Sequence, residues 1–341
     1  MASSYLPEIL VGADVFSEPG RSRYEWRNQR SFAAIKSDGS VVSWGSVSND
    51  GGEEVIRYVK EGPFKQIFSN RHSFAAIRAD GKLITWGNGG RGGEKGKAKD
   101  DLQEGVEQVF STRRSFSALK SDGSVISWGK DEEGGDNSLA ADQLSSDVVK
   151  LFSTGTSMAA LKSDGSVVTW GLSTKDPRSK SLGGDIDTGS PRGGDSSAVS
   201  DQIDKNVVDI FSSRYAFAAL KNNGRVVAWG DPLRGGDTGD SQRLLNKGVQ
   251  KIASNGTSFA ALKSNGRVVT WGDPWRGGSK DLVDFHTYHW TLGEDESEPE
   301  ILKSVKKDLR SGVEEIFSTR YAYAALKSDG KLITWGLKKA G

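Results

Sequence analysis

The sequence predicts an all-β fold, a seven-bladed β-propeller with short helical pieces and two longer insertions in the blade connections. The dipeptide Trp-Gly occurs seven times, and four of the six intervals between its tryptophans are 42 residues. Each copy also contains three short β-type segments separated by turn residues. A fixed period near 40 residues marks a repeat architecture, and radial closure of small antiparallel units leaves few exposed strand edges. An open β-solenoid is the competing architecture, but it usually has shorter repeats and atypical terminal units, whereas these seven copies are alike.

The copy at residues 64–87 shows the order of its elements. Residues 64–69 alternate apolar and polar side chains and predict a first strand, and residues 73–78 form an apolar run that predicts a second strand, buried on both faces. Residues 79–81, Ala-Asp-Gly, predict a hairpin turn because glycine accepts the positive φ of tight turns. Residues 83–86 are rich in β-formers and predict the third strand.

In this copy the third strand is followed by a glycine-rich exit at residues 88–94 and then by a short helical piece at residues 100–103. In the first copy we place the first strand at residues 13–17. We expect the tryptophan of each copy to pack between neighbouring blades. The seven units argue for a single domain over residues 1–341, with repeat cores near residues 31–45, 73–87, 115–129, 157–171, 216–230, 258–272 and 322–336.

Composition excludes several classes of function. Lys plus Arg is 46 and Asp plus Glu is 45, so no overall field favours nucleic acid or an anionic membrane. Without cysteine the chain has neither a disulfide nor a thiolate metal site nor a cysteine nucleophile. The first ten residues lack the basic and apolar regions of a secretory signal, and no apolar run reaches 18 residues. We therefore expect a cytoplasmic protein that is a monomer and does not contact a membrane.

The repeat resembles a known superfamily. The sequence ALKSDGSVVTWG at residues 160–171, with exits such as Gly-Asp-Pro-Leu-Arg-Gly-Gly-Asp at 230–237, is similar to repeats of the regulator of chromosome condensation superfamily, in its bacterial and protist Gly-Gly-Asp form. The resemblance covers roughly residues 13 to 337 and implies a seven-bladed propeller. It also implies an alternative function in guanine-nucleotide exchange or in association with chromatin or nucleic acid. The Gly-Trp-Arg-Trp-Gly cluster of the superfamily's light sensor is absent, since Trp275-Arg276 is followed by Gly-Gly.

The two faces of the predicted propeller differ in their variability. Antiparallel order places the turns between the second and third strands on one face, where every copy has Asp or Asn before Gly: Asp38, Asp80, Asp122, Asp164, Asn223, Asn265 and Asp329. Turn chemistry explains these residues, because a calcium loop needs more carboxylates at defined spacing. The loops between the first and second strands, the A–B loops, lie on the opposite face together with the exits of the third strands.

The A–B loop face carries the candidate binding residues. It differs from copy to copy and is rich in arginine and aromatic residues, which dominate protein interfaces. The candidates are Trp26, Arg71, His72, Arg113, Arg114, Arg214, Tyr215, Trp275, Trp290, Arg320 and Tyr321. The insertions at about residues 172–195 and 273–299 leave from this face, and either could be functional or ornamental.

The hypothesis is a non-catalytic scaffold that binds a protein partner through this face. The bland alternative is that its Arg and Tyr residues stack on one another at the channel mouth and bind nothing. No nucleophile elbow, phosphate loop or dinucleotide fingerprint is present, so we expect no catalytic residue and no cofactor. His286 and His289 lie three residues apart, but they favour a surface cluster over a metal site. Binding of nucleic acid by the basic rim, an enzyme active site at the mouth and a light sensor remain less favoured alternatives.

Overall fold

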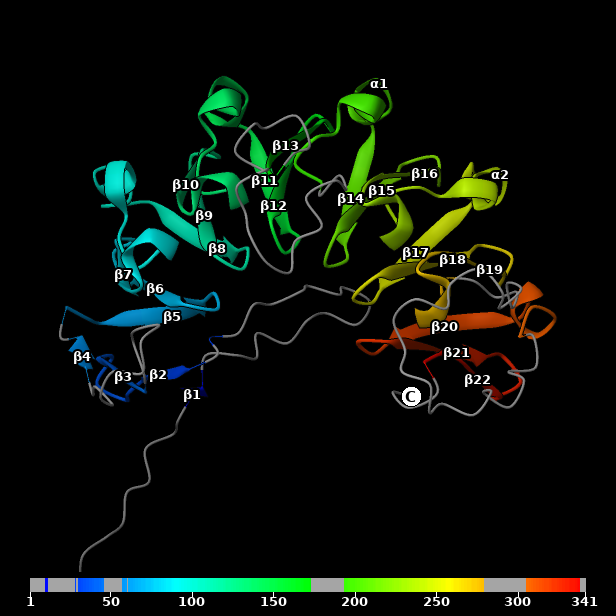
Figure 1. The fold of residues 1–341 in the computed structure, drawn as a ribbon, viewed down its shortest axis with the longest axis horizontal. Helices are drawn as coiled ribbons and strands as arrows, with labels where there is room; N and C mark the ends of the chain where they lie inside the picture. The colour runs from blue at the N-terminus through cyan, green and yellow to red at the C-terminus, as the bar shows by residue number, and fades with distance from the viewer. Residues whose placement is uncertain are drawn as a thin grey trace, which may run out of the picture. The chain divides into compact units, whose positions relative to one another are not determined.

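The computed structural model describes residues 10–11, 28, 30–45, 57–59, 61–172, 193–278 and 305–337. These residues form seven small antiparallel sheets, one of four strands and six of three (Figure 1). The predicted fold class is confirmed: the chain is mostly β, with seven sheets like propeller blades and two short α-helices. The chain divides into two compact units, with four sheets before residue 197 and three after it. The expectation of a single domain over residues 1–341 stays a prediction.

The first unit contains four sheets and short 3-10 helices in their connections. Its strands are β1 (Leu10–Val11), β2 (Ser31–Ile35), β3 (Val41–Gly45), β4 (Arg57–Val59), β5 (Phe64–Ser69), β6 (Ser73–Arg78), β7 (Leu83–Gly87), β8 (Val106–Ser111), β9 (Ser115–Lys120), β10 (Val125–Gly129), β11 (Val148–Ser153), β12 (Ser157–Lys162) and β13 (Val167–Gly171). Its 3-10 helices are η1 (Gly89–Arg91), η2 (Gly96–Lys99), η3 (Asp131–Glu133), η4 (Ser138–Ala140) and η5 (Asp142–Leu144).

The second unit contains three sheets and both α-helices. Its strands are β14 (Val207–Ser212), β15 (Ala216–Lys221), β16 (Val226–Gly230), β17 (Val249–Ser254), β18 (Ser258–Lys263), β19 (Val268–Gly272), β20 (Val313–Ser318), β21 (Ala322–Lys327) and β22 (Leu332–Gly336). Its helices are η7 (Ser197–Val199), α1 (Ser200–Ile203), η8 (Pro232–Arg234), η9 (Gly239–Ser241), α2 (Gln242–Leu245), η10 (Pro274–Arg276) and η12 (Asp308–Arg310).

The repeat predicted from residues 64–87 is confirmed in strands β5, β6 and β7. They pair in sequence order, with Phe68 opposite Ala75 and Phe74 opposite Trp86. Five of the six residues of β6 are buried, as the apolar run predicts. The helical piece expected at residues 100–103 is instead the 3-10 helix η2, which ends at Lys99.

The first sheet differs from its prediction. The short strand β1 pairs with β2 and sets Val11 opposite Ala34. Residues 13–17, the first strand expected from the sequence, lie outside the described residues. A fourth strand, β4, pairs with β3 and was not predicted.

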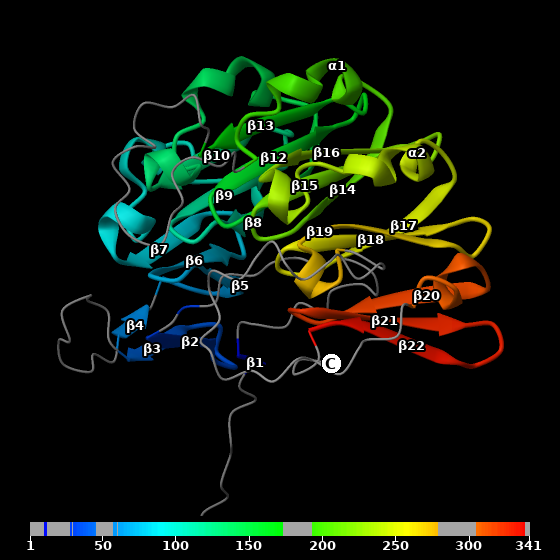
Figure 2. The same cartoon turned by 45° about the vertical axis from the view of Figure 1, so that its right-hand side comes forward.

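The repeated tryptophan packs between neighbouring sheets, as expected. Trp271 stacks on Phe259 with ring centroids 5.1 Å apart and shares a buried cluster with Phe211 and Ala218 of the preceding sheet. Its Nε1 donates a hydrogen bond to the carbonyl of Gly235 in the preceding exit, at 3.1 Å. Within the first unit Trp128 and Trp170 donate the same bond to Gly92 and Gly134, and in the second unit Trp335 donates to Gly277. Figure 2 shows such neighbouring sheets at β18 and β20, which are also in contact.

The turns between second and third strands are uniform. In all seven turns the Asp or Asn side chain accepts a hydrogen bond from the backbone N–H two residues later, as Asp122 does from Ser124 at 2.9 Å. Hydrogen bonds from Ser124 lower the pKa of Asp122. The turn glycine links neighbouring sheets, because its carbonyl accepts from the start of the next first strand, as Gly81 does from Val106 at 3.0 Å. This turn face is therefore an ordered but repetitive surface.

No helix among the described residues is long and apolar enough to span a membrane.

Candidate binding face at the A–B loops

Each A–B loop is held by the side chain of its first residue. In the loop between β5 and β6, Asn70 Oδ1 accepts hydrogen bonds from the N–H groups of His72 at 2.8 Å and Ser73 at 2.9 Å. In the loop between β17 and β18, Asn255 binds the corresponding N–H groups of Thr257 and Ser258, both at 2.9 Å. Asn, Ser and Thr commonly close such turns with their side chains. The side chain of the third loop residue therefore projects from a backbone whose conformation is fixed by these hydrogen bonds.

The second residues of neighbouring loops are joined through their backbones. In the first unit the N–H of Arg71 donates to the carbonyl of Arg113 at 3.3 Å, and the N–H of Arg113 donates to Gly155 at 3.1 Å. In the second unit Arg214 donates to Gly256, and Gly256 donates to Arg320, each at 3.1 Å. The structure thus brings Arg71 beside Arg113 and places Gly256 between Arg214 and Arg320. Residues 42 or 64 positions apart in sequence meet in this way because the sheets stack, not because of local sequence.

A buried carboxylate neutralises part of the arginine cluster in the first unit. Glu133 has a fully buried side chain and lies 3.1 Å from Arg114 Nη1 and 3.8 Å from Arg113 Nη2. Burial raises the pKa of Glu133, and the two guanidinium groups oppose that effect. Arg113 is itself only 9% exposed, so its side chain serves chiefly to hold Glu133.

His72 lies among arginines and is neutral at pH 7. Its Nδ1 is 3.3 Å from Arg91 Nη1, and because arginine only donates hydrogen bonds, Nδ1 accepts and Nε2 carries the proton. Burial lowers the pKa of His72 to about 4, with further lowering by Arg91, Arg114 and Arg71. A neutral ring orients Arg91 without adding charge to the cluster.

This lowered pKa predicts a pH-dependent contribution to stability. Between pH 6.5 and about 4 the unfolded chain binds a proton at His72 that the folded chain does not. The contribution of His72 should be complete above pH 6.5 and fall as the pH drops towards 4. Because His72 is half-exposed, we expect wild type to lose on the order of 1–2 kcal/mol relative to His72→Gln over this range. Urea unfolding of both proteins at pH 7.5 and 4.5 measures the difference, and a pH-independent difference would contradict the assignment.

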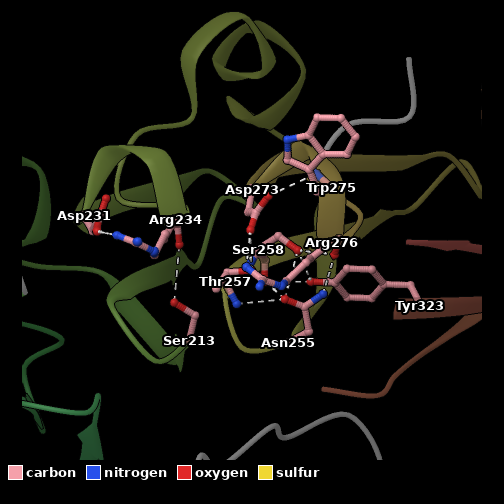
Figure 3. A network of polar contacts seen from close by, with 10 residues as sticks. All are labelled: Ser213, Asp231, Arg234, Asn255, Thr257, Ser258, Asp273, Trp275, Arg276 and Tyr323. Carbon is pink, nitrogen blue, oxygen red and sulfur yellow. Dashed lines mark hydrogen bonds and ion pairs between the residues drawn. The ribbon is translucent and has the colours of Figure 1, made fainter. Parts of the chain in front are cut away.

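In the second unit, Asp231 organises an arginine and an aromatic ring. Its Oδ1 accepts a hydrogen bond from the N–H of Leu233, and its fully buried carboxylate also forms an ion pair with Arg234 (Figure 3). The guanidinium of Arg234 lies 4.6 Å from the ring centroid of Tyr215, and that of Arg214 lies 5.2 Å from it. Tyr215 is thus flanked by two cations.

The next exit repeats this arrangement but reaches the following sheet. Asp273 Oδ2 binds Arg276 Nη1 at 2.7 Å and accepts a hydrogen bond from Thr257 Oγ1 at 3.2 Å (Figure 3). Since Thr257 stands where the preceding loop has tyrosine, Arg276 packs over Tyr321, 5.2 Å from its centroid. Arg320 lies 5.1 Å from the same ring.

Most of the residues predicted from the sequence fall into these two groups. Arg71, His72, Arg113 and Arg114 belong to the first unit, and Arg214, Tyr215, Arg320 and Tyr321 belong to the second. Trp275 is 45% exposed in η10, and its N–H donates to Asp273 Oδ1 at 3.0 Å. Trp26 and Trp290 lie outside the described residues, as does most of both insertions.

The residues of the exits that complete both groups were not among those predicted from the sequence. They are Arg91, Glu133, Asp231, Arg234, Asp273 and Arg276. The repeated string Asp-Pro-x-Arg-Gly-Gly at two exits could have revealed four of them. Glu133 occupies the exit position that is arginine in three other copies, and this difference could have revealed a fifth residue.

The described residues include no group of three or more His, Asp or Glu side chains arranged to hold a metal ion. The groups that the face offers are guanidinium groups, aromatic rings and the carboxylates of Glu133, Asp231 and Asp273, each paired with arginine. These groups recognise charged and planar partners through hydrogen bonds and stacking.

No protein-family model matches the sequence, and no curated protein matches it. Solved structures do match. Human WBSCR16 is 17% identical, with a TM-score of 0.38 over 72% of this chain and 75% of that one. Prp20p from Saccharomyces cerevisiae is 15% identical, with a TM-score of 0.34 over 60% of this chain and 57% of that one.

The ectodomain of the receptor kinase CR4 from Physcomitrella patens is 15% identical, with a TM-score of 0.40 over 92% of this chain and 72% of that one. Prp20 is also described as yeast RCC1. The solved structures that this chain matches thus include RCC1-like β-propellers, the superfamily that its repeats resemble.

Proposed function

We propose that the chain is a non-catalytic protein-binding scaffold that docks a protein partner through its A–B loop face. The observation that supports this most is the contrast between the two faces. The turn face repeats one Asp or Asn cap seven times, whereas the second and third residues of the A–B loops vary among the copies: Arg71-His72, Arg113-Arg114, Gly155-Thr156, Arg214-Tyr215, Gly256-Thr257 and Arg320-Tyr321. Repeated residues serve the scaffold, so the varying residues are the ones available for recognition.

The contacts on this face suit a preorganised interface. Arg234 and Arg276 are each held by a carboxylate and by the face of a tyrosine ring. Stacking uses the face of the guanidinium and leaves its N–H edges in the plane, where they form hydrogen bonds. Side chains that are already ordered lose less entropy on binding, so a partner is bound more tightly. The alternative is a purely structural role, in which these side chains only stabilise one another. It predicts that no partner requires them for binding.

Charge reversal on this face tests the proposal. Arg113 and Arg114 are unsuitable because a glutamate at either position would face the buried Glu133. A variant with Arg71→Glu, Arg214→Glu and Arg320→Glu changes three second-position side chains instead. We expect a partner captured by the immobilised wild type from a cell extract of the source organism to be lost at least about tenfold from this variant, since interface arginines are common hot spots.

A matched variant on the turn face provides the control. Lys82→Glu, Arg267→Glu and Lys331→Glu alter three residues that follow turn glycines and change the net charge equally. This variant should retain the partner, and circular dichroism should show that both variants are folded. Equal capture by all three proteins, or equal loss from both variants, would contradict the proposal.

A further inference from the structure

The exits of the third strands show what the arginine in this position binds. The exits of β16 and β19 begin with aspartate and have arginine three residues later, and each arginine forms an ion pair with the aspartate of its own exit: Asp231 with Arg234 and Asp273 with Arg276. In these two exits the arginine therefore binds a carboxylate.

The exit of β7 keeps the arginine but lacks the carboxylate. Asn88 stands where the other two exits have aspartate, and Arg91 stands where they have arginine. The backbone is the same, with φ −72° and ψ 116° at Asn88 against −66° and 113° at Asp231. The Asn88 side chain makes no capping hydrogen bond, whereas that of Asp231 does.

No other carboxylate replaces the missing one. Among the described residues none lies within the 4.0 Å ion-pair distance of Arg91, and Glu133 pairs with Arg113 and Arg114 instead. Arg91 contacts the neutral His72, and both Arg91 and Arg114 lie close enough to that ring to lower its pKa. Burial and the charge of Arg114 lower the pKa of Arg91, and the more distant charge of Glu133 opposes them without forming an ion pair.

We propose that Arg91, oriented by His72 and reinforced by Arg114, binds a carboxylate from an acidic segment of a protein partner. This inference rests on the proposed function and names the chemistry of the partner. The incoming carboxylate supplies the charge that Asp231 and Asp273 supply to the arginines of their own exits. A guanidinium binds a carboxylate through two parallel hydrogen bonds, so the geometry of the ligand matches the residue.

Asn88→Asp tests the inference without removing any arginine. It gives Arg91 the carboxylate that the other exits contain, on a backbone that already accepts aspartate, so the internal carboxylate should occupy the site. Asn223→Asp is the matched control: it adds the same charge on the turn face, where five of the seven copies have aspartate. The probe is a fluorescently labelled tetraglutamate peptide, measured by anisotropy at low ionic strength.

Wild type and Asn223→Asp should bind the peptide alike, and Asn88→Asp should bind it about tenfold or more weakly, as expected for the loss of a charge-assisted contact. The ring proton resonances of His72 provide a second measurement. A carboxylate beside Arg91 should raise the pKa of His72 from about 4, on peptide binding to wild type and in Asn88→Asp alone. Circular dichroism shows separately that Asn88→Asp is folded, because unfolding would also raise the pKa of His72, towards 6.5.

Two binding results overturn the inference: no binding of the peptide to wild type, and equal binding of the peptide by wild type and Asn88→Asp. A third is stronger competition from inorganic phosphate than from unlabelled tetraglutamate, which would assign the site to phosphate. The proposed function fails separately. If the Arg71, Arg214 and Arg320 variant still captures the partner, that function is wrong even where the peptide binds. If capture is lost but the peptide does not bind wild type, only the acidic segment is wrong.

Discussion

Trp271→Ala should lower the free energy of unfolding by about 3–5 kcal/mol, the range for removing a large buried aromatic side chain. Trp271 is 3% exposed and lies between two sheets, stacked on Phe259 of its own sheet and in one buried cluster with Phe211 of the preceding sheet. Alanine leaves a cavity there and removes the Nε1 hydrogen bond to Gly235. Both effects weaken the packing of one sheet on the next, so the loss is larger than burial alone would cause.

Chemical denaturation followed by circular dichroism measures this loss. Trp275→Ala is the control, because Trp275 is the neighbouring tryptophan and is 45% exposed. We expect its effect to stay within roughly 0.5 kcal/mol, as for most surface substitutions. Comparable losses in the two variants would show that the repeated tryptophan does not stabilise the contact between sheets.

Gly235→Ala should destabilise the protein by about 2–4 kcal/mol, from a strained backbone and an overpacked contact. Gly235 has φ +100°, and a Cβ there would lie 2.6 Å from two ring carbons of Phe259 in the next sheet. The ring is held by its stack on Trp271 and cannot move aside. The same glycine accepts the tryptophan hydrogen bond, so any backbone shift disturbs that bond as well.

Gly134→Ala separates the two causes. Gly134 is the equivalent residue of the exit after β10 and has nearly the same φ, +95°. Its Cβ would meet Met158 Cγ at 3.3 Å, and the flexible methionine can adjust. We expect a loss of roughly 1–2 kcal/mol, mostly from the backbone. Thermal unfolding of both variants gives the comparison, and a Gly134→Ala loss as large as that of Gly235→Ala would remove the steric explanation.

The sequence was sufficient for the blades because their determinants are local. The Asp-Gly turn, the apolar second strand and the Trp-Gly end all lie within one copy, so periodicity and turn chemistry predict the strands of residues 64–87 almost to the residue. The first copy is a separate case: β1 pairs with β2 through Leu10 and Val11, which have no distinctive sequence pattern, and the strand predicted at residues 13–17 lies outside the described residues.

The binding face was predicted less completely because its contacts cross between loops. Arg71 and Tyr215 could be chosen from composition, but the partners that orient them come from elsewhere. Arg276 reaches Tyr321 in the following sheet because Thr257 leaves its own loop without a ring. Contacts of this kind depend on how neighbouring sheets stack, and the sequence of a single repeat does not reveal that.

The hydrogen bonds between second loop residues use only main-chain atoms. The linkage runs from Arg71 to Arg113 to Gly155 in the first unit and from Arg214 to Gly256 to Arg320 in the second. The side chains of these residues take no part in it. Architecture and specificity are therefore separable at these positions. Apart from Arg113, whose guanidinium holds the buried Glu133, a residue there can be exchanged without rebuilding its neighbours, so the face can acquire a new partner one blade at a time, while Trp-Gly and the glycines of the exits keep the rest of the molecule unchanged.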